Sequence, residues 1–205
     1  MIFLLLLVLD NIVVMWIPKP SFMNSLSQDW QTKIIETILA LAFMFTYRKV
    51  SLKEYGLTSK LETGSLKPII ITFFLITVLV NGVQYLQDGF GGHTGTERLL
   101  YQATMPGIAQ ELLYRGAMLG LLNKAFGKPW KIFGANMGWG AIITSVLYGL
   151  IHGLAADVHF QIYFFFGKLL ITGLIGFALA WAKERSGSLI PSIVAHNFIN
   201  FTGSF

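Results

Sequence analysis

Long apolar runs alternate with short polar segments along the whole chain. A helix needs about 20 apolar residues, with roughly 17 tolerated, to cross the hydrocarbon core of a bilayer. The hydrophobic pattern predicts seven segments of this kind, at residues 1–17, 34–47, 68–86, 106–123, 137–154, 160–182 and 189–204. Because the residue-by-residue alternation of a membrane β-barrel does not occur in them, we expect these segments to be helices.

This pattern predicts an all-α fold, a polytopic transmembrane helical bundle of about seven membrane helices. The first segment contains Asp10 and lacks a preceding basic stretch, so we expect a helix of the bundle rather than a cleaved signal peptide. We predict a single membrane domain over residues 1–205, since no change of composition divides the chain. In it, residues 1–100 form N-terminal helices of unspecific sequence, and residues 101–205 form a core that carries the informative polar residues.

Composition supports lipid as the solvent of most side chains. Hydrophobic residues make up 54% of the chain and charged residues 12%, about half the charged fraction of soluble domains. There is no cysteine, which excludes disulfides and thiolate chemistry. The net charge of +5 does not indicate a nucleic-acid partner, because the basic residues are spread between the apolar segments.

Basic residues are concentrated in every second loop, and such loops usually stay in the cytoplasm. The residues concerned are Arg48, Lys49, Lys53, Lys60 and Lys67 in the first basic loop, Lys124, Lys128 and Lys131 in the second, and Lys183 and Arg185 in the third. The distribution predicts a cytoplasmic N-terminus and an external C-terminus. We therefore expect a multi-pass integral protein of a bacterial cell membrane, with lipid as its first partner.

Three of the apolar segments carry polar residues that are costly in lipid, at about 2.5–3.5 kcal/mol for an ionisable side chain, and that mark candidate functional sites. In the fourth segment, Glu111 and Arg115 are four residues apart and share a helix face, with Gln110 on the adjoining face. Taken alone, this pair could equally be a structural ion pair that holds helices together.

The fifth and seventh segments carry histidines at the same four-residue spacing. Tyr148 and His152 share one helix face, and Ser192, His196 and Asn200 form a polar stripe on another helix. Such residues can simply join helices by hydrogen bonds. A carboxylate, an arginine, two histidines and an asparagine in one apolar bundle nevertheless indicate a hydrolytic site. His159, in the loop that follows, is expected to be solvated.

These three segments resemble the motifs of the CAAX protease and bacteriocin-processing family of intramembrane proteases. The family pattern is Glu-Glu-x-x-x-Arg, then Phe-x-x-x-His, then His-x-x-x-Asn or Asp, on successive helices. The corresponding residues here are Gln110, Glu111 and Arg115, then Tyr148 and His152, then His196 and Asn200. The resemblance covers roughly residues 100–205.

The resemblance implies a glutamic intramembrane endopeptidase that hydrolyses peptide bonds of membrane-associated substrates, such as prenylated proteins or peptide precursors. It implies a catalytic group in which Gln110 holds the water-activating position, with His152 beside it. In this group His196 and Asn200 stabilise the oxyanion. Glu111 and Arg115 form a supporting ion pair, and Tyr148 contacts the substrate. A membrane-embedded peptide or protein is then the expected partner.

Gln110 is the important departure from the family pattern. Its amide resembles a glutamate in shape but cannot accept a proton at neutral pH. We therefore expect an inactive or silenced form of the protease. Tyr148 in place of phenylalanine is a mild change, because the aromatic ring remains.

Two alternatives follow from the same residues. A zinc ion could be held by His152, His196 and Glu111, but we favour a mechanism with no cofactor, because no His-Glu-x-x-His helix is present. The chain could also be a non-catalytic membrane protein, for example a bacteriocin-immunity or regulatory protein that binds a peptide or protein partner. A transporter fits less well, since the chain shows no repeated halves.

The charge pattern makes a testable prediction about topology. With the N-terminus inside, Glu111 lies in the outer half of the fourth segment, and the site opens toward the outer face. Single cysteines at Asn123 and Gln87 should differ in labelling from intact cells, with Gln87 the more reactive. Preferential labelling at Asn123 would show the inverted orientation.

Overall fold

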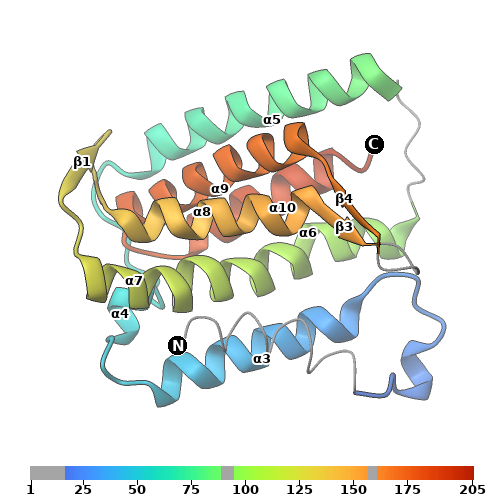
Figure 1. Cartoon of the computed structure of the whole chain (residues 1–205), viewed down its shortest axis with the longest axis horizontal. Helices are drawn as coiled ribbons and strands as arrows, with labels where there is room; N and C mark the ends of the chain where they lie inside the picture. The colour runs from blue at the N-terminus through green and yellow to red at the C-terminus, as the bar shows by residue number, and fades with distance from the viewer. Residues whose placement is uncertain (1–16, 89–94, 157–160) are drawn as a thin grey trace.

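The computed structural model describes residues 17–88, 95–156 and 161–205. In this part of the chain the protein is a bundle of roughly parallel and antiparallel helices (Figure 1). The helices are α3 (Trp30–Thr46), α4 (Leu52–Tyr55), α5 (Leu66–Asp88), α6 (Thr96–Glu111), α7 (Leu119–Phe126), α8 (Trp139–Gly153), α9 (Phe166–Ser186) and α10 (Ile190–Thr202). The all-helical class predicted from the sequence is therefore confirmed.

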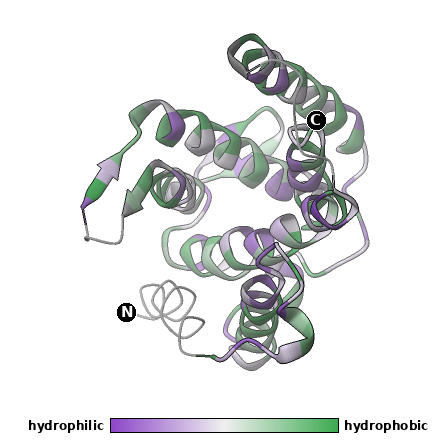
Figure 2. Cartoon of the chain, turned by 90° about the vertical axis from the view of Figure 1, so that its right-hand side faces the viewer, coloured by the Kyte–Doolittle hydropathy of each residue, from purple (hydrophilic) through white to green (hydrophobic). Residues whose placement is uncertain are grey.

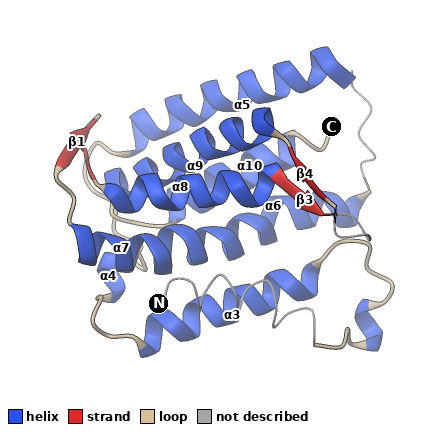
Figure 3. Cartoon of the chain, in the orientation of Figure 1, coloured by secondary structure: helices blue, strands red, loops and turns tan. Residues whose placement is uncertain are grey.

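Short elements connect these helices (Figure 3). A 3-10 turn, Ser21–Met23, precedes α3, and the π-helix Leu112–Met118 joins α6 to α7. Two small antiparallel hairpins were not expected. Strands β1 (Trp130–Ile132) and β2 (Ala135–Met137) pair with Trp130 opposite Met137, and strands β3 (Leu154–Ala156) and β4 (Ile162–Phe164) pair with Leu154 opposite Phe164.

The expected crossings agree only in part with the helices. By length and composition, two helices in the described ranges, α5 and α9, could cross a membrane, and α8 is a shorter apolar helix. Seven crossings are not confirmed: the segment at 1–17 lies almost wholly outside the described residues, and α10 has only 13 residues. The segment expected at 160–182 is divided, because β4 occupies its start and α9 begins at Phe166.

Helix α5 has a largely exposed apolar surface, as expected of a helix that faces lipid. Phe74 is 61% exposed and Leu79 is 68% exposed. Much of the ribbon of the other helices also carries hydrophobic residues (Figure 2), and exposed ones among them include Leu174 of α9 and Val194 of α10. An apolar surface of this extent is unfavourable in water and indicates a membrane or a partner.

Two buried clusters fill the bundle. The first lies between α3, α4, the π-helix and α8, and its largest members include Met44, Tyr55 and Met118. The second lies between α5, α9 and α10 and includes Phe73 and Leu179. The site described below lies where α8 and α10 approach the α6–α7 segment.

Close helix contacts depend on glycine at two crossings. The backbone N–H of Gly107 on α6 donates to Asn197 Oδ1 on α10 at 2.7 Å, and Asn197 Nδ2 donates to the Thr104 carbonyl at 2.9 Å. A Cβ at position 107 would lie against the Asn197 amide and 2.9 Å from the Ile193 carbonyl oxygen. On α8, a Cβ at Gly149 would lie 2.6 Å from the Leu169 carbonyl oxygen of α9.

The three basic loops lie at the same end of the bundle, on the left in Figure 1, together with α4 and β1. The C-terminus and the β3–β4 hairpin lie toward the opposite end. This grouping agrees with the alternating loop charges. The side of the membrane that each end faces stays a prediction.

The α6–α10 crossing predicts a large effect of a small substitution. Gly107→Ala should lower the free energy of unfolding by about 1–3 kcal/mol, because the added methyl forces α6 away from Asn197 and Ile193 of α10. Gly82→Ala is the matched control, since nothing lies within 4 Å of its Cβ position. Thermal unfolding in detergent measures both variants, and equal midpoints would contradict the close packing.

Candidate active site

The polar residues of the fourth segment lie at a change of helix type. Helix α6 contains Pro106, which has no N–H to donate, and it continues at Leu112 as a π-helix. All residues of this π-helix are buried. Wide helical turns of this kind are rare in proteins as a whole, but where they occur they are frequently at functional sites. The change places Glu111 at the end of the α-helical part, in the middle of the α6–α7 segment.

Glu111 and Arg115 form a fully buried ion pair, with both side chains 0% exposed. Arg115 Nη1 donates to Glu111 Oε1 at 3.0 Å, and Nη2 donates to the Gly176 carbonyl of α9 at 3.0 Å. Gly176 makes room for this contact, because a Cβ there would lie 3.0 Å from Arg115 Nη2. The pair therefore fixes α9 as well as its own helix.

His196 of α10 joins the same carboxylate. Its Nδ1 lies 2.8 Å from Glu111 Oε1, and its Nε2 lies 3.4 Å from the Tyr148 hydroxyl. Because a carboxylate only accepts hydrogen bonds, Nδ1 carries the proton in the neutral ring, and Nε2 accepts from Tyr148. Donation from Nε2 to a substrate oxyanion would need a second proton on this ring, with Glu111 as its counter-charge.

Tyr148 links the ion pair to the second histidine. The Arg115 guanidinium lies over the Tyr148 ring, 4.4 Å from its centre, and the His152 ring centre is 4.3 Å away. His152 Nδ1 lies 2.8 Å from the Tyr148 carbonyl oxygen. That carbonyl can only accept, so Nδ1 is protonated and the lone pair of a neutral His152 is on Nε2. His152 is thus set as a proton acceptor through Nε2.

The structure brings together five of the residues singled out in the sequence: Glu111, Arg115, Tyr148, His152 and His196. Gln110 and Asn200 are half-buried, and within the described residues neither side chain bonds to this group. The Gln110 Oε1 atom is buried and has no partner in the same part of the chain. The catalytic roles of all seven residues stay predictions.

Asn197 is the polar residue that the sequence reasoning missed. It is 8% exposed and makes two hydrogen bonds from α10 to α6, to Gly107 and Thr104. On the same helix, Ser192 donates to the Leu179 carbonyl of α9 at 2.9 Å. An amide in lipid is as costly at Asn197 as at Asn200. The position of Asn197 directly after His196 was therefore the signal in the sequence that could have identified it. His159 lies outside the described residues.

The zinc alternative fits these contacts poorly. In the described ranges, no group of three His, Asp or Glu side chains is arranged to hold a metal ion. Glu111 Oε1 is occupied by Arg115 and by His196 Nδ1, so the carboxylate faces a cation and a donor. The possible ligand atoms that remain are the two histidine Nε2 atoms and Glu111 Oε2, which is buried and has no partner among the described residues; they are not arranged as a metal-binding group, and Glu111 lies against the Arg115 cation.

Comparison with protein families supports the resemblance seen in the motifs. Residues 95–202 match the family model described as type II CAAX prenyl endopeptidase, Rce1-like. This range contains all three motifs and more than half of the chain. No curated protein and no solved structure gives a significant match.

The buried ion pair predicts that Glu111→Gln is strongly destabilising. Loss of the carboxylate charge leaves Arg115 buried without a counter-ion, which typically costs about 3–5 kcal/mol. Lys124→Gln is the control, because its ion pair with Glu54 is long, at 3.6 Å, and exposed, so about 0–1 kcal/mol is expected. Chemical unfolding in detergent compares the two, and a loss below that of the control would contradict the structural role of Glu111.

Proposed function

Because the chain belongs to the Rce1-like family of type II CAAX prenyl endopeptidases, we propose that it is an intramembrane endopeptidase with an attenuated active site. Its substrate is a membrane-associated peptide or protein, such as a prenylated protein or a peptide precursor. The family is a membrane-embedded protease family, and the apolar helices α5 and α9 agree with that environment.

The observation that supports this proposal most is the arrangement of the two histidines around Tyr148. His152 offers a lone pair on Nε2, because the Tyr148 carbonyl holds its Nδ1 proton. A water bonded to this atom would lose its proton to His152 as it attacks the scissile carbonyl. The Tyr148 O–H is then the donor nearest to the developing oxyanion, and His196 joins it only when Nε2 is also protonated; hydrogen bonds to that charge lower the barrier.

Glu111 and Arg115 act in this proposal by position rather than by contact with the substrate. Glu111 orients His196 through Nδ1 and is itself fixed by Arg115. Arg115 in turn lies over the Tyr148 ring and binds the Gly176 carbonyl. The reacting groups are therefore held by a rigid second layer, which reduces the reorganisation needed during the reaction.

Gln110 limits the rate in this proposal. At the position where the family has its water-activating glutamate, an amide can hold a water molecule but cannot take its proton. The buried and unpartnered Oε1 of Gln110 agrees with a water-binding role. His152 would then be the only base beside the water, and the chain as it stands is a weak or silent protease.

The same residue supports a second candidate function, a non-catalytic immunity or regulatory protein that binds a peptide or protein partner. Loss of the glutamate removes a base but leaves the shape of the site intact. Such a protein would retain the buried Glu111–Arg115 pair for stability alone. Measured turnover separates this candidate from an attenuated protease.

The proposal predicts that Gln110→Glu increases peptide hydrolysis. A restored general base should raise the rate by about 10²–10⁴-fold. The assay compares the chain as given, Gln110→Glu and Gln110→Glu with His152→Ala on a prenylated reporter peptide in liposomes. Gln110→Ala controls for loss of the amide, and it should not exceed the activity of the given sequence.

Equal and robust turnover by the given sequence and by Gln110→Glu would show that another group is the base. Binding of the reporter peptide without turnover by either protein would favour the non-catalytic function. Retained activity after His152→Ala in the Gln110→Glu background would remove His152 from the proposed reaction.

A further inference from the structure

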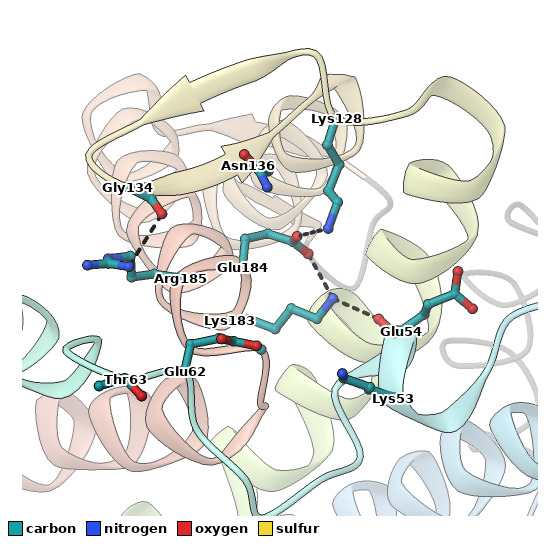
Figure 4. Close-up of a pocket in the computed structure, with 11 residues that line it drawn as sticks. Lys53, Glu54, Glu62, Thr63, Lys128, Gly134, Asn136, Lys183, Glu184 and Arg185 are labelled. Atoms are coloured by element: carbon teal, nitrogen blue, oxygen red, sulfur yellow. Dashed lines mark hydrogen bonds and ion pairs between the residues drawn. The ribbon is translucent and has the colours of Figure 1, made fainter.

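A polar pocket lies at the basic end of the bundle, away from the candidate active site. Its cavity volume is about 650 Å³, and it is lined by α4, the segment after it, the β1–β2 hairpin and the end of α9 (Figure 4). Lys183 and Glu184 lie side by side in its centre, with Lys128, Glu62 and Lys53 around them.

The centre of the pocket is built from buried, mutually bonded groups. Lys183 is 4% exposed, and its Nζ donates to Glu184 Oε1 at 2.7 Å and to the Glu54 carbonyl at 2.9 Å. Glu184 also accepts from Lys128 at 2.8 Å and from Asn123 at 3.0 Å. The single carboxylate of Glu184 therefore balances two lysines, which leaves one positive charge in excess.

The rim adds cations that lack an acidic partner. Lys53 is exposed and has no ion pair in the described part of the chain. Arg185 makes only a long bond of 3.4 Å to the Gly134 carbonyl, and its Nε is buried without a partner among the described residues. Glu54 already bonds to the Ser51 backbone N–H at 2.7 Å, which lowers its pKa and keeps it ionised.

The charges facing the pocket therefore favour an anion. Four of the residues that line it are basic, namely Lys53, Lys128, Lys183 and Arg185, and three are acidic, namely Glu54, Glu62 and Glu184, for a net charge of +1. The nearby Lys124, which pairs with Glu54 at 3.6 Å, raises the total to +2. A phosphate diester is an anion that the surface of a membrane offers.

An apolar groove of about 380 Å³ begins next to the pocket. It lies between α5 and α10 and is lined almost entirely by apolar side chains, including Ile70, Phe74, Val194 and Phe198. The two cavities lie next to each other along the chain, because Leu61 lines the groove and the next residue, Glu62, lines the pocket. At this point the Glu62 N–H donates to the Ser186 carbonyl at 2.9 Å.

We propose that the pocket and the groove together bind one anionic phospholipid, with its phosphate in the polar pocket (Figure 4) and an acyl chain between α5 and α10. A charged pocket next to an apolar groove matches an amphiphile with an anionic headgroup. Anionic lipids are abundant on the side of the membrane where basic loops reside. The acyl chain would cover the face of α10 that does not carry His196.

The test measures binding of dioctanoyl phosphatidylglycerol to the full-length protein in uncharged detergent. The double variant Lys53→Gln with Arg185→Gln should weaken binding about tenfold or more, because two of the four positive charges that line the pocket are removed. Lys131→Gln is the matched control, since Lys131 is exposed on the same hairpin and does not line the pocket. If the double variant unfolds, the single variant Lys53→Gln replaces it in the test. It is expected to bind the lipid several-fold more weakly than the unchanged protein.

Two further ligands distinguish the sources of affinity. Dioctanoyl phosphatidylcholine should bind clearly more weakly, because its headgroup carries no net charge, and inorganic phosphate should not compete at similar concentrations, because it lacks the acyl chain. Equal binding of both lipids, full competition by phosphate, or an equal effect of Lys131→Gln would each overturn the proposal. Protease activity is not part of this test, so its outcome is independent of the proposed function.

Discussion

The ion pair between Glu111 and Arg115 is the interaction on which the rest of the structure depends. A charge in a low-dielectric interior is costly unless it is paired and hydrogen-bonded. Arg115 is paired with Glu111 and also binds the Gly176 carbonyl and the face of Tyr148, and Glu111 also binds His196, although Arg115 Nε and Glu111 Oε2 have no partner among the described residues. The pair therefore imposes contacts on α8, α9 and α10 at once.

The same contacts set the chemistry of the candidate site. Each histidine has its Nδ1 against an acceptor, Glu111 for His196 and the Tyr148 carbonyl for His152. In both neutral rings the lone pair is consequently on Nε2. Structural bonds thus decide which nitrogen can take a proton, and a chain with glutamine at position 110 retains one imidazole placed as a base.

The molecule is also divided along its length. The buried pair lies in the middle of the α6–α7 segment, whereas the basic loops gather at one end and close around Lys183 and Glu184. Side chains of α5 face outward along the bundle, as lipid requires. The proposed phospholipid site lies where the charged end meets this apolar surface, so it uses the boundary between the two environments.

The sequence by itself determined the helical class, the family and the local pairings. A spacing of four residues fixes Glu111 beside Arg115 and Tyr148 beside His152, because helix geometry is local. It could not decide whether Asn197 or Asn200 meets α6, since residues three apart share a helix face and the choice depends on the close crossing at Gly107. Nor could it show that His196 binds Glu111 or that Lys183 is buried with Glu184, because these contacts join residues of separate helices or depend on burial. The two hairpins were not predicted from the sequence for a related reason: short apolar runs fit a strand or a helix equally well until the segments that pack against them are known.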